Sequence, residues 1–143
     1  CLILWNSSKA AGIYLQKSGH CIVRQNILRG KATNETNSGN GIHLWYCSNA
    51  LILDNEIYQH RDGIYFEFVD NSSIRGNHSE GNVRYGLHFM FSNHDEYIGN
   101  RFKRNGTGVA VMFSDHIIMK WQATVLSTIQ SVCFPTAATG SRS

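Results

Sequence analysis

Short segments in which apolar and polar residues alternate recur along the chain, and each begins with a glycine followed by an aliphatic residue. The clearest segments span residues 41–46, 63–68, 86–91 and 108–113. An alternation of period two predicts β-strands, with the apolar second and fourth positions facing the core and the third and fifth positions facing out. The sixth position is aromatic in all four segments, and we expect these rings to continue the inward face as a stack: Tyr46, Phe68, Phe91 and Phe113.

Two sequence markers recur at a nearly constant spacing. The glycines are separated by 29, 22, 23 and 22 residues: Gly12, Gly41, Gly63, Gly86 and Gly108. An asparagine follows each of the first four glycines by 14 residues: Asn26, Asn55, Asn77 and Asn100. We expect each asparagine to adopt the left-handed conformation at a turn, and its amide to hydrogen-bond to the asparagine one repeat away. The longer first repeat contains a polar loop insertion at residues 31–37.

The length of the repeat defines the fold class. A repeat of about 22 residues is too short for a βαβ unit but accommodates two or three short strands, and equivalent strands of successive repeats can stack at the ~4.8 Å strand spacing. The sequence therefore predicts an all-β protein, a right-handed single-stranded parallel β-helix (pectin-lyase-like solenoid), present as a fragment of about four to five coils. We expect residues 1–120 to form the coils and residues 121–143, where the repeat is lost, to form a divergent C-terminal tail or cap.

Composition and charge narrow the possible functions. Thirteen glycines and a single proline suit a sheet interrupted by tight turns better than a helical protein. The net charge of +3 comes from scattered residues and does not indicate a nucleic-acid partner. No apolar segment is long enough to span a membrane, so direct membrane insertion is not expected. Because the chain begins at Cys1 within an expected strand, we expect the signal peptide to be missing from this fragment.

Three successive repeats resemble those of the NosD family, periplasmic proteins that mature the copper site of nitrous oxide reductase. The resemblance is carried by residues 61–66, 84–93 and 108–114, and it extends over about residues 12–120. Its specific part is a Gly-Leu-His-aromatic-Met-aromatic-Ser repeat followed by a Gly-Val-Ala-Val-Met-aromatic-Ser repeat, a pairing that the fold itself does not require.

This resemblance implies a location, a set of partners and a role. It implies a periplasmic accessory protein that works with the subunits of an ABC transporter and docks nitrous oxide reductase and a copper chaperone. It also implies that the β-helix itself is not an enzyme, and that any bound copper is transient.

The predicted outward positions form a face rich in aromatic and methionine side chains. Its candidate partner-binding residues are Tyr14, His43, Trp45, Tyr65, Glu67, His88, Met90 and Met112, and Gln16 and Ala110 complete the two columns. Met90 and Met112 occupy equivalent positions in adjacent repeats and His88 lies two residues before Met90, so these three side chains could bind Cu(I), which prefers soft ligands. The alternative is a hydrophobic protein interface in which methionine fills gaps.

The other histidines and Cys47 are expected to have no role as ligands. The histidines fall at turns or coil edges, where lone histidines are usually solvated: His20, His60, His78, His94 and His116. Cys47 follows a strand, and we expect it to be a small buried residue rather than a thiolate ligand.

Two alternatives to docking remain open, and both concern carbohydrates. A polysaccharide-modifying lyase, epimerase or hydrolase needs acidic residues, and hydrolysis needs two carboxylates at a fixed separation. Glu67 is the one acid among the outward positions, with Asp70 near the following turn. A carbohydrate-binding β-helix could instead use Tyr65 and Trp45 as a sugar-binding platform, although the methionines fit that function less well.

Overall fold

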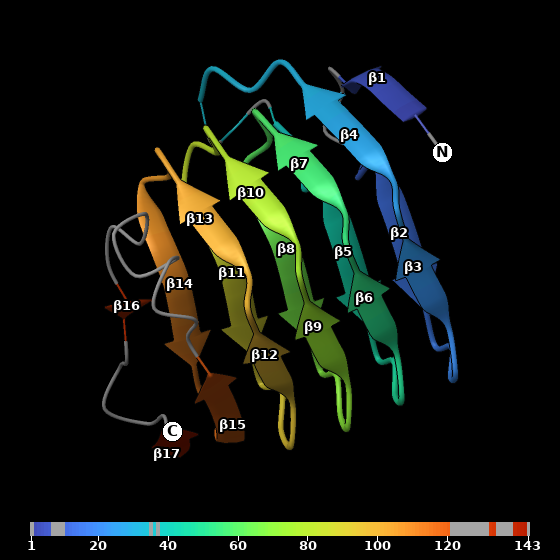
Figure 1. The fold of residues 1–143 in the computed structure, drawn as a ribbon, viewed down its shortest axis with the longest axis vertical. Coiled ribbons are helices and arrows are strands. Elements are labelled where there is room, and N and C mark those ends of the chain that lie inside the picture. The colour runs from blue at the N-terminus through green and yellow to red at the C-terminus, as the bar shows by residue number, and fades with distance from the viewer. Residues whose placement is uncertain are drawn as a thin grey trace.

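The chain forms a solenoid of three parallel β-sheets in a computed structural model (Figure 1). The structure describes residues 2–6, 11–34, 36, 38–120, 132–133 and 139–142. Successive coils contribute one strand to each sheet, and the coils stack side by side from the N-terminal to the C-terminal end (Figure 1). The fold is therefore the right-handed parallel β-helix that the repeat predicted. No helix in the described residues is long and apolar enough to cross a membrane.

Each sheet contains the equivalent strands of successive coils. The first sheet is β1 (Leu2–Asn6), β4 (Ile27–Gly30), β7 (Glu56–Tyr58), β10 (His78–Glu80) and β13 (Arg101–Lys103). The second sheet is β2 (Ile13–Gln16), β5 (Ile42–Trp45), β8 (Asp62–Glu67), β11 (Tyr85–Met90), β14 (Thr107–Met112) and β16 (Val132–Cys133). The third sheet is β3 (Ile22–Arg24), β6 (Leu51–Leu53), β9 (Ser73–Arg75), β12 (Glu96–Ile98), β15 (Asp115–Lys120) and β17 (Thr139–Arg142).

The solenoid has about 3 turns, slightly fewer than the four to five coils that the repeats predicted. In the described residues, β2, β3 and β13 each lie at the edge of a sheet. The coils at the two ends of the solenoid therefore have fewer neighbours than the coils in the middle. The predicted divergent tail, residues 121–143, lies mostly outside the described residues. Its two described strands, β16 and β17, pair in parallel with β14 and β15.

The core is formed by the inward columns that the alternation predicted. From β5 to β14 the second and fourth positions of the repeat are completely buried: Ile42, Leu44, Ile64, Phe66, Leu87, Phe89, Val109 and Val111. The first sheet adds Leu28, Ile57 and Phe102, in register with the polar residue Ser79. Ser79 is nevertheless buried, because its hydroxyl donates to the backbone oxygen of Gly86 at 2.9 Å.

The expectation that the sixth position points inward is wrong. Tyr46 and Phe113 are 49% and 50% exposed, and all four aromatic residues of this column have a positive φ of 48–54°. A left-handed residue ends the strand, so the alternation of faces stops there and the side chain turns outward. The four rings do stack, as predicted, but on the surface: their centroids are 4.5, 5.1 and 5.2 Å apart along the series Tyr46, Phe68, Phe91 and Phe113.

The asparagine ladder is present as predicted. Asn55 donates from its backbone N–H and from Nδ2 to Oδ1 of Asn77, both at 2.9 Å, and Asn77 donates to Asn100 in the same way. The expected left-handed conformation belongs instead to the preceding residue in each coil: Gln25, Asp54, Gly76 and Gly99. That arrangement turns the chain just before the asparagine and directs its amide into the coil.

Candidate docking face and copper site

The outer face of the second sheet brings the predicted site residues into two adjacent columns. In the first column Tyr14, His43, Tyr65 and His88 lie in register, with ring centroids 5.0, 4.7 and 4.7 Å apart. In the second column Trp45, Glu67, Met90 and Met112 lie in register and are all half-buried. Aromatic and thioether groups therefore form one continuous surface, beside the exposed aromatic ladder of Tyr46, Phe68, Phe91 and Phe113.

Two residues of the first column do not reach solvent, contrary to the expectation for outward positions. His88 is 2% exposed and Ala110 is completely buried. Tyr65 and Tyr85 contact the His88 ring with centroid distances of 4.7 and 4.6 Å, and they cover it. Ala110 has a short side chain on a strand that is paired on both sides, with β11 and β16.

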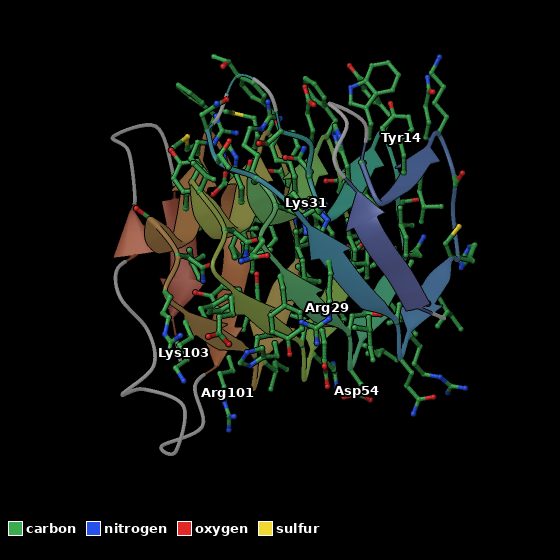
Figure 2. All side chains as sticks on the ribbon, turned by 90° about the horizontal axis from the view of Figure 1, so that it is seen from above. Tyr14, Arg29, Lys31, Asp54, Arg101 and Lys103 are labelled. Carbon is green, nitrogen blue, oxygen red and sulfur yellow. The ribbon has the colours of Figure 1, made fainter. Side chains whose placement is uncertain are left out.

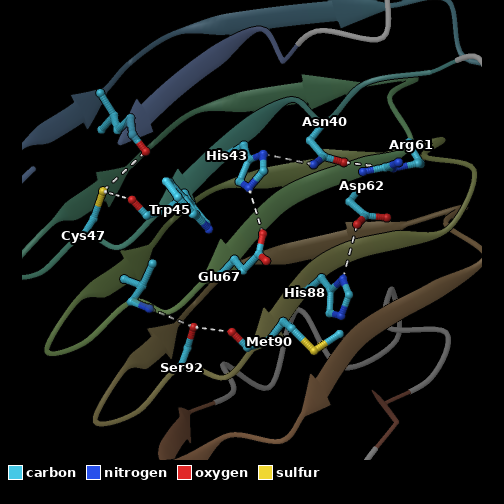
Figure 3. A network of polar contacts seen from close by, with 12 residues as sticks. Asn40, His43, Trp45, Cys47, Arg61, Asp62, Glu67, His88, Met90 and Ser92 are labelled. Atoms are coloured by element: carbon cyan, nitrogen blue, oxygen red, sulfur yellow. Dashed lines mark hydrogen bonds and ion pairs between the residues drawn. The ribbon is translucent and has the colours of Figure 1, made fainter. Parts of the chain in front are cut away.

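A buried ion-pair network holds the imidazole of His88. Arg84 binds both carboxylate oxygens of Asp62, at 2.9 and 2.7 Å. Nδ1 of His88 lies 3.3 Å from Asp62 Oδ2 (Figure 3). Burial alone would raise the pKa of Asp62, but the hydrogen bonds from His88 and Arg84 outweigh it and hold that pKa below its usual value. Sequence reasoning missed this network, although Asp62 directly precedes the repeat glycine Gly63 and Arg84 lies two residues before Gly86.

The second ring nitrogen of His88 is unpaired among the described residues. Nε2 is buried and has no hydrogen-bond partner among the described residues. A histidine whose Nδ1 contacts a carboxylate and whose Nε2 is free has the arrangement typical of a metal ligand. Met90 lies beside His88 in Figure 3, and Met112 pairs with Met90 in the next coil. One imidazole nitrogen and two thioethers form a donor set that fits Cu(I).

The described residues contain no group of three or more His, Cys, Asp and Glu side chains that could hold a metal. The only donor set that we identify in this face therefore includes the two methionines. Such a set would favour the soft Cu(I) ion over Zn²⁺ and other borderline or hard ions.

His43 and Glu67 form a second polar contact on this face. Nε2 of His43 lies 3.5 Å from Glu67 Oε2, and its Nδ1 lies 3.5 Å from Asn40 Nδ2 (Figure 3). Burial lowers the pKa of His43 more than the neighbouring Glu67 raises it. Burial, together with the charges of Glu67 and Asp62, raises the pKa of Tyr65 to about 12. Tyr65 is therefore not tuned to exchange protons near neutral pH.

The histidines outside this face differ from one another. His20 and His94 are exposed turn residues with a positive φ, as expected. His116 is also exposed with a positive φ, at the start of β15. His78 is half-buried, with Nε2 2.7 Å from Glu80 Oε2. The expectation for His60 is wrong: it is 1% exposed, and neither ring nitrogen has a hydrogen-bond partner among the described residues.

Cys47 is buried, as expected. It is 4% exposed and donates to the backbone oxygens of Leu15 and Trp45, at 3.4 and 3.5 Å (Figure 3). Its thiol therefore has local partners and lies apart from the His88 cluster.

Fold and face together define a parallel β-helix protein with an aromatic and methionine-rich outer surface. The model of one family, described as periplasmic copper-binding protein (NosD), matches residues 29–129. The chain belongs to the NosD family. No curated protein matches its sequence significantly.

Proposed function

We propose that this chain is part of a periplasmic scaffold, without catalytic activity of its own, that docks protein partners during copper-site assembly of nitrous oxide reductase. In this proposal the partners are the reductase, a copper chaperone and the subunits of an ABC transporter. Family membership supports the link to copper and to the periplasm. The outer face of the second sheet supports docking.

The observation that carries the proposal is the surface formed by the aromatic ladder and the adjacent second column. Tyr46, Phe91 and Phe113 are 44–50% exposed, and Met90 and Met112 lie next to them on the same strands and turns. Exposed apolar side chains that form one contiguous patch mark interaction sites, and methionine adapts to partners of different shape. The carboxylates on this face fit hydrolysis less well, because Asp62 is completely buried and paired with Arg84.

A transient copper site is the second part of the proposal. His88, Met90 and Met112 would hold Cu(I), and Asp62 would fix the orientation of the His88 ring. When bound, copper would be passed on as cargo and would not serve in a reaction of this chain. Arg84, which binds both carboxylate oxygens of Asp62, would hold that carboxylate in place.

Docking can be tested by measuring the affinity of the purified chain for copper-free nitrous oxide reductase and for the copper chaperone. We expect Phe91→Ser combined with Phe113→Ser to weaken binding by about tenfold or more, because aromatic anchors dominate interface energies. Ile22→Ser is the matched control, since Ile22 is 63% exposed but lies on β3 of the third sheet. An equal loss of affinity in the control and in the double variant would contradict the proposal that this face docks the partners.

Copper binding can be tested by competition with a chromophoric Cu(I) chelator. Met90→Leu and Met112→Leu preserve side-chain volume and remove sulfur, so we expect each to lower Cu(I) affinity while the circular dichroism spectrum stays unchanged. Met119→Leu replaces the one methionine of the sequence outside the proposed donor set and serves as the control. Wild-type Cu(I) affinity in the Met90/Met112 double variant would exclude the copper site and leave docking intact.

A further inference from the structure

The first sheet carries a hollow on the side of the coil away from the docking face. It has a volume of about 320 Å³ and is lined by Arg29, Tyr58, Gln59, Glu80, Gly81 and Arg104. These residues come from four successive coils, because β4, β7, β10 and β13 are consecutive neighbours in the sheet. A hollow of this size is within the range that holds a small organic molecule.

The guanidinium of Arg29 forms one end of the hollow. It lies over the ring of Tyr58, 4.5 Å from the ring centroid. The Tyr58 hydroxyl donates to Glu56 Oε2 at 3.1 Å, so one carboxylate lies near this end of the hollow. A guanidinium stacked on a ring still has its N–H groups in its own plane, and these can bind a carboxylate or phosphate through two hydrogen bonds. Arg29 belongs to β4, and Arg101 and Lys103 belong to β13; Figure 2 labels all three in the lower half of its view, with Arg101 and Lys103 next to each other and Arg29 apart from them.

Arg104 stands at the opposite end, and the hollow retains a positive charge. The Arg104 side chain is 73% exposed, and its Nη1 lies 3.6 Å from Glu80 Oε1. Glu80 is the single acid that lines the hollow, and its other oxygen accepts from His78 at 2.7 Å. Its neighbour in register on β13 is Lys103. With Glu56 beside Tyr58, two carboxylates lie near three cations, Arg29, Lys103 and Arg104, and the excess of positive charge favours a further anion.

Gly81 creates the space between the two ends. Gln59, Gly81 and Arg104 occupy equivalent left-handed turn positions in successive coils, and Gly81 has a φ of +70°. A Cβ added at Gly81 would meet its nearest neighbour, Gln59 Cγ, only at 3.6 Å. The missing side chain therefore leaves a gap in an otherwise continuous column, and that gap deepens the hollow.

We propose that the hollow binds a small, elongated organic molecule with an anionic group at each end. One group would pair with Arg29 and the other with Arg104, across three strand spacings, roughly 14 Å between the backbones. The ring of Tyr58 and the gap at Gly81 would accommodate the body of the molecule. Carboxylates and phosphates share this chemistry. The site is on a different sheet from the docking face, so it does not depend on the function proposed above.

Isothermal titration calorimetry at low ionic strength can test the site with three probes. Fructose 1,6-bisphosphate carries two phosphates, digalacturonate carries two carboxylates, and inorganic phosphate carries one anionic group. We expect at least one of the two-ended probes to bind about tenfold more tightly than inorganic phosphate, because both arginines are engaged. The probe that binds identifies the type of anion.

Variants of the full 143-residue chain localise the binding. Arg29→Gln and Arg104→Gln should each lower the affinity for the probe by about fivefold or more. Gly81→Asn should fill the hollow with a side chain, and asparagine tolerates the left-handed backbone conformation of this position. Arg101→Gln removes the same charge from the same face outside the hollow, and we expect an effect below about twofold. Absence of binding by both two-ended probes, or an equal loss in Arg101→Gln and Arg104→Gln, would overturn the proposal.

Discussion

His60 is an imidazole enclosed in the coil at a position where the next two coils carry asparagine. Its backbone N–H donates to Asn82 Oδ1 at 2.9 Å, and Asn82 donates in the same way to Asn105 at 3.0 Å. The asparagine side chains of this second ladder also bond to each other, whereas the His60 ring has no partner among the described residues. Burial lowers the pKa of His60 to about 4. The ring is therefore neutral in the folded protein at neutral pH.

We predict that His60 makes the protein sensitive to acid. Its folded pKa lies below the unfolded value of 6.5, so stability is unaffected above that pH and decreases as the pH falls toward 4. The loss would approach about 3 kcal/mol at the lower limit. His60→Asn should extend the second ladder and remove most of this loss. Urea unfolding at pH 7.5 and 4.5 measures the loss of stability in both proteins. The prediction would be contradicted if the free energy of unfolding of the variant had the same pH dependence as that of the wild type.

Asp95 has the opposite pH dependence. It lies in register with Ser72, whose backbone N–H donates to Asp95 Oδ1 at 2.8 Å, while the buried Oδ2 has no partner among the described residues. Burial raises the pKa of Asp95 to about 8. The folded protein therefore retains a proton that the unfolded chain releases above its pKa of 3.8, and stability decreases as the pH rises from about 4 to about 8.

Asp95→Ser should stabilise the protein, and by more at pH 8 than at pH 4. A serine at this position reproduces Ser72, whose hydroxyl accepts from the backbone N–H of Ala50 at 3.0 Å, and it removes the carboxylate. The comparison of unfolding midpoints at the two pH values tests this prediction. A variant that is less stable than the wild type at pH 8 would show that the carboxylate has a partner in solution.

At the scale of the strand and its turn, the asparagine ladder fixes each coil to the next. Asn77 accepts two hydrogen bonds from Asn55 and donates to Asn100 and to the backbone oxygen of Ile52. Asn77→Asp replaces the buried donor with an acceptor that faces Asn100 Oδ1, and we expect a loss of several kcal/mol. Chemical denaturation measures the loss.

Asn71→Asp provides the matched control for the ladder prediction. It is the same chemical change in the same coil, but Asn71 is an exposed turn residue with a positive φ that aspartate also tolerates. We expect a change within about 0.5 kcal/mol. A similar loss in both variants would indicate a general effect of charge and not a loss of the ladder.

The strands could be predicted from the sequence, but the side-chain direction at their ends could not. Alternation identifies inward positions such as Ile64 and Phe66, because both periodicity and burial depend on the same extended backbone. Phe68 continues the same parity and yet turns outward, since its φ of 54° ends the strand. Aromatic residues rarely adopt that conformation, and no residue type in the column signals it.

The candidate site could be predicted only in part, because the repeat determines the register of the strands but not the conformation of the side chains. Register in a β-helix places Met90 beside Met112, so their adjacency follows from the repeat alone. The burial of His88 depends on the Tyr65 and Tyr85 rings that cover it, and their placement is a matter of side-chain conformation. The sequence does not predict the burial of His60, because its position in the repeat indicates a solvated turn, whereas the chain there turns the ring inward.

At the scale of the whole molecule, stability is distributed coil by coil. Every sheet pairing joins neighbouring coils, so a coil in the middle has partners on both sides and a coil at an end has fewer. We predict that backbone amides of β8 and β9 exchange with solvent more slowly than those of β2 and β3. Hydrogen exchange followed by mass spectrometry tests this gradient, and uniform protection would show that the solenoid opens as a single unit.

The pairing of each coil with its immediate neighbours has an evolutionary consequence. A duplication or deletion of one whole repeat would leave every remaining interface the same as before, because the new neighbours present the same register of asparagine, aliphatic and turn residues. The outer face would lengthen or shorten by one row without a change in the other rows. Copying of single repeats is therefore a simple route by which proteins of this kind could adjust the length of a binding surface to a partner.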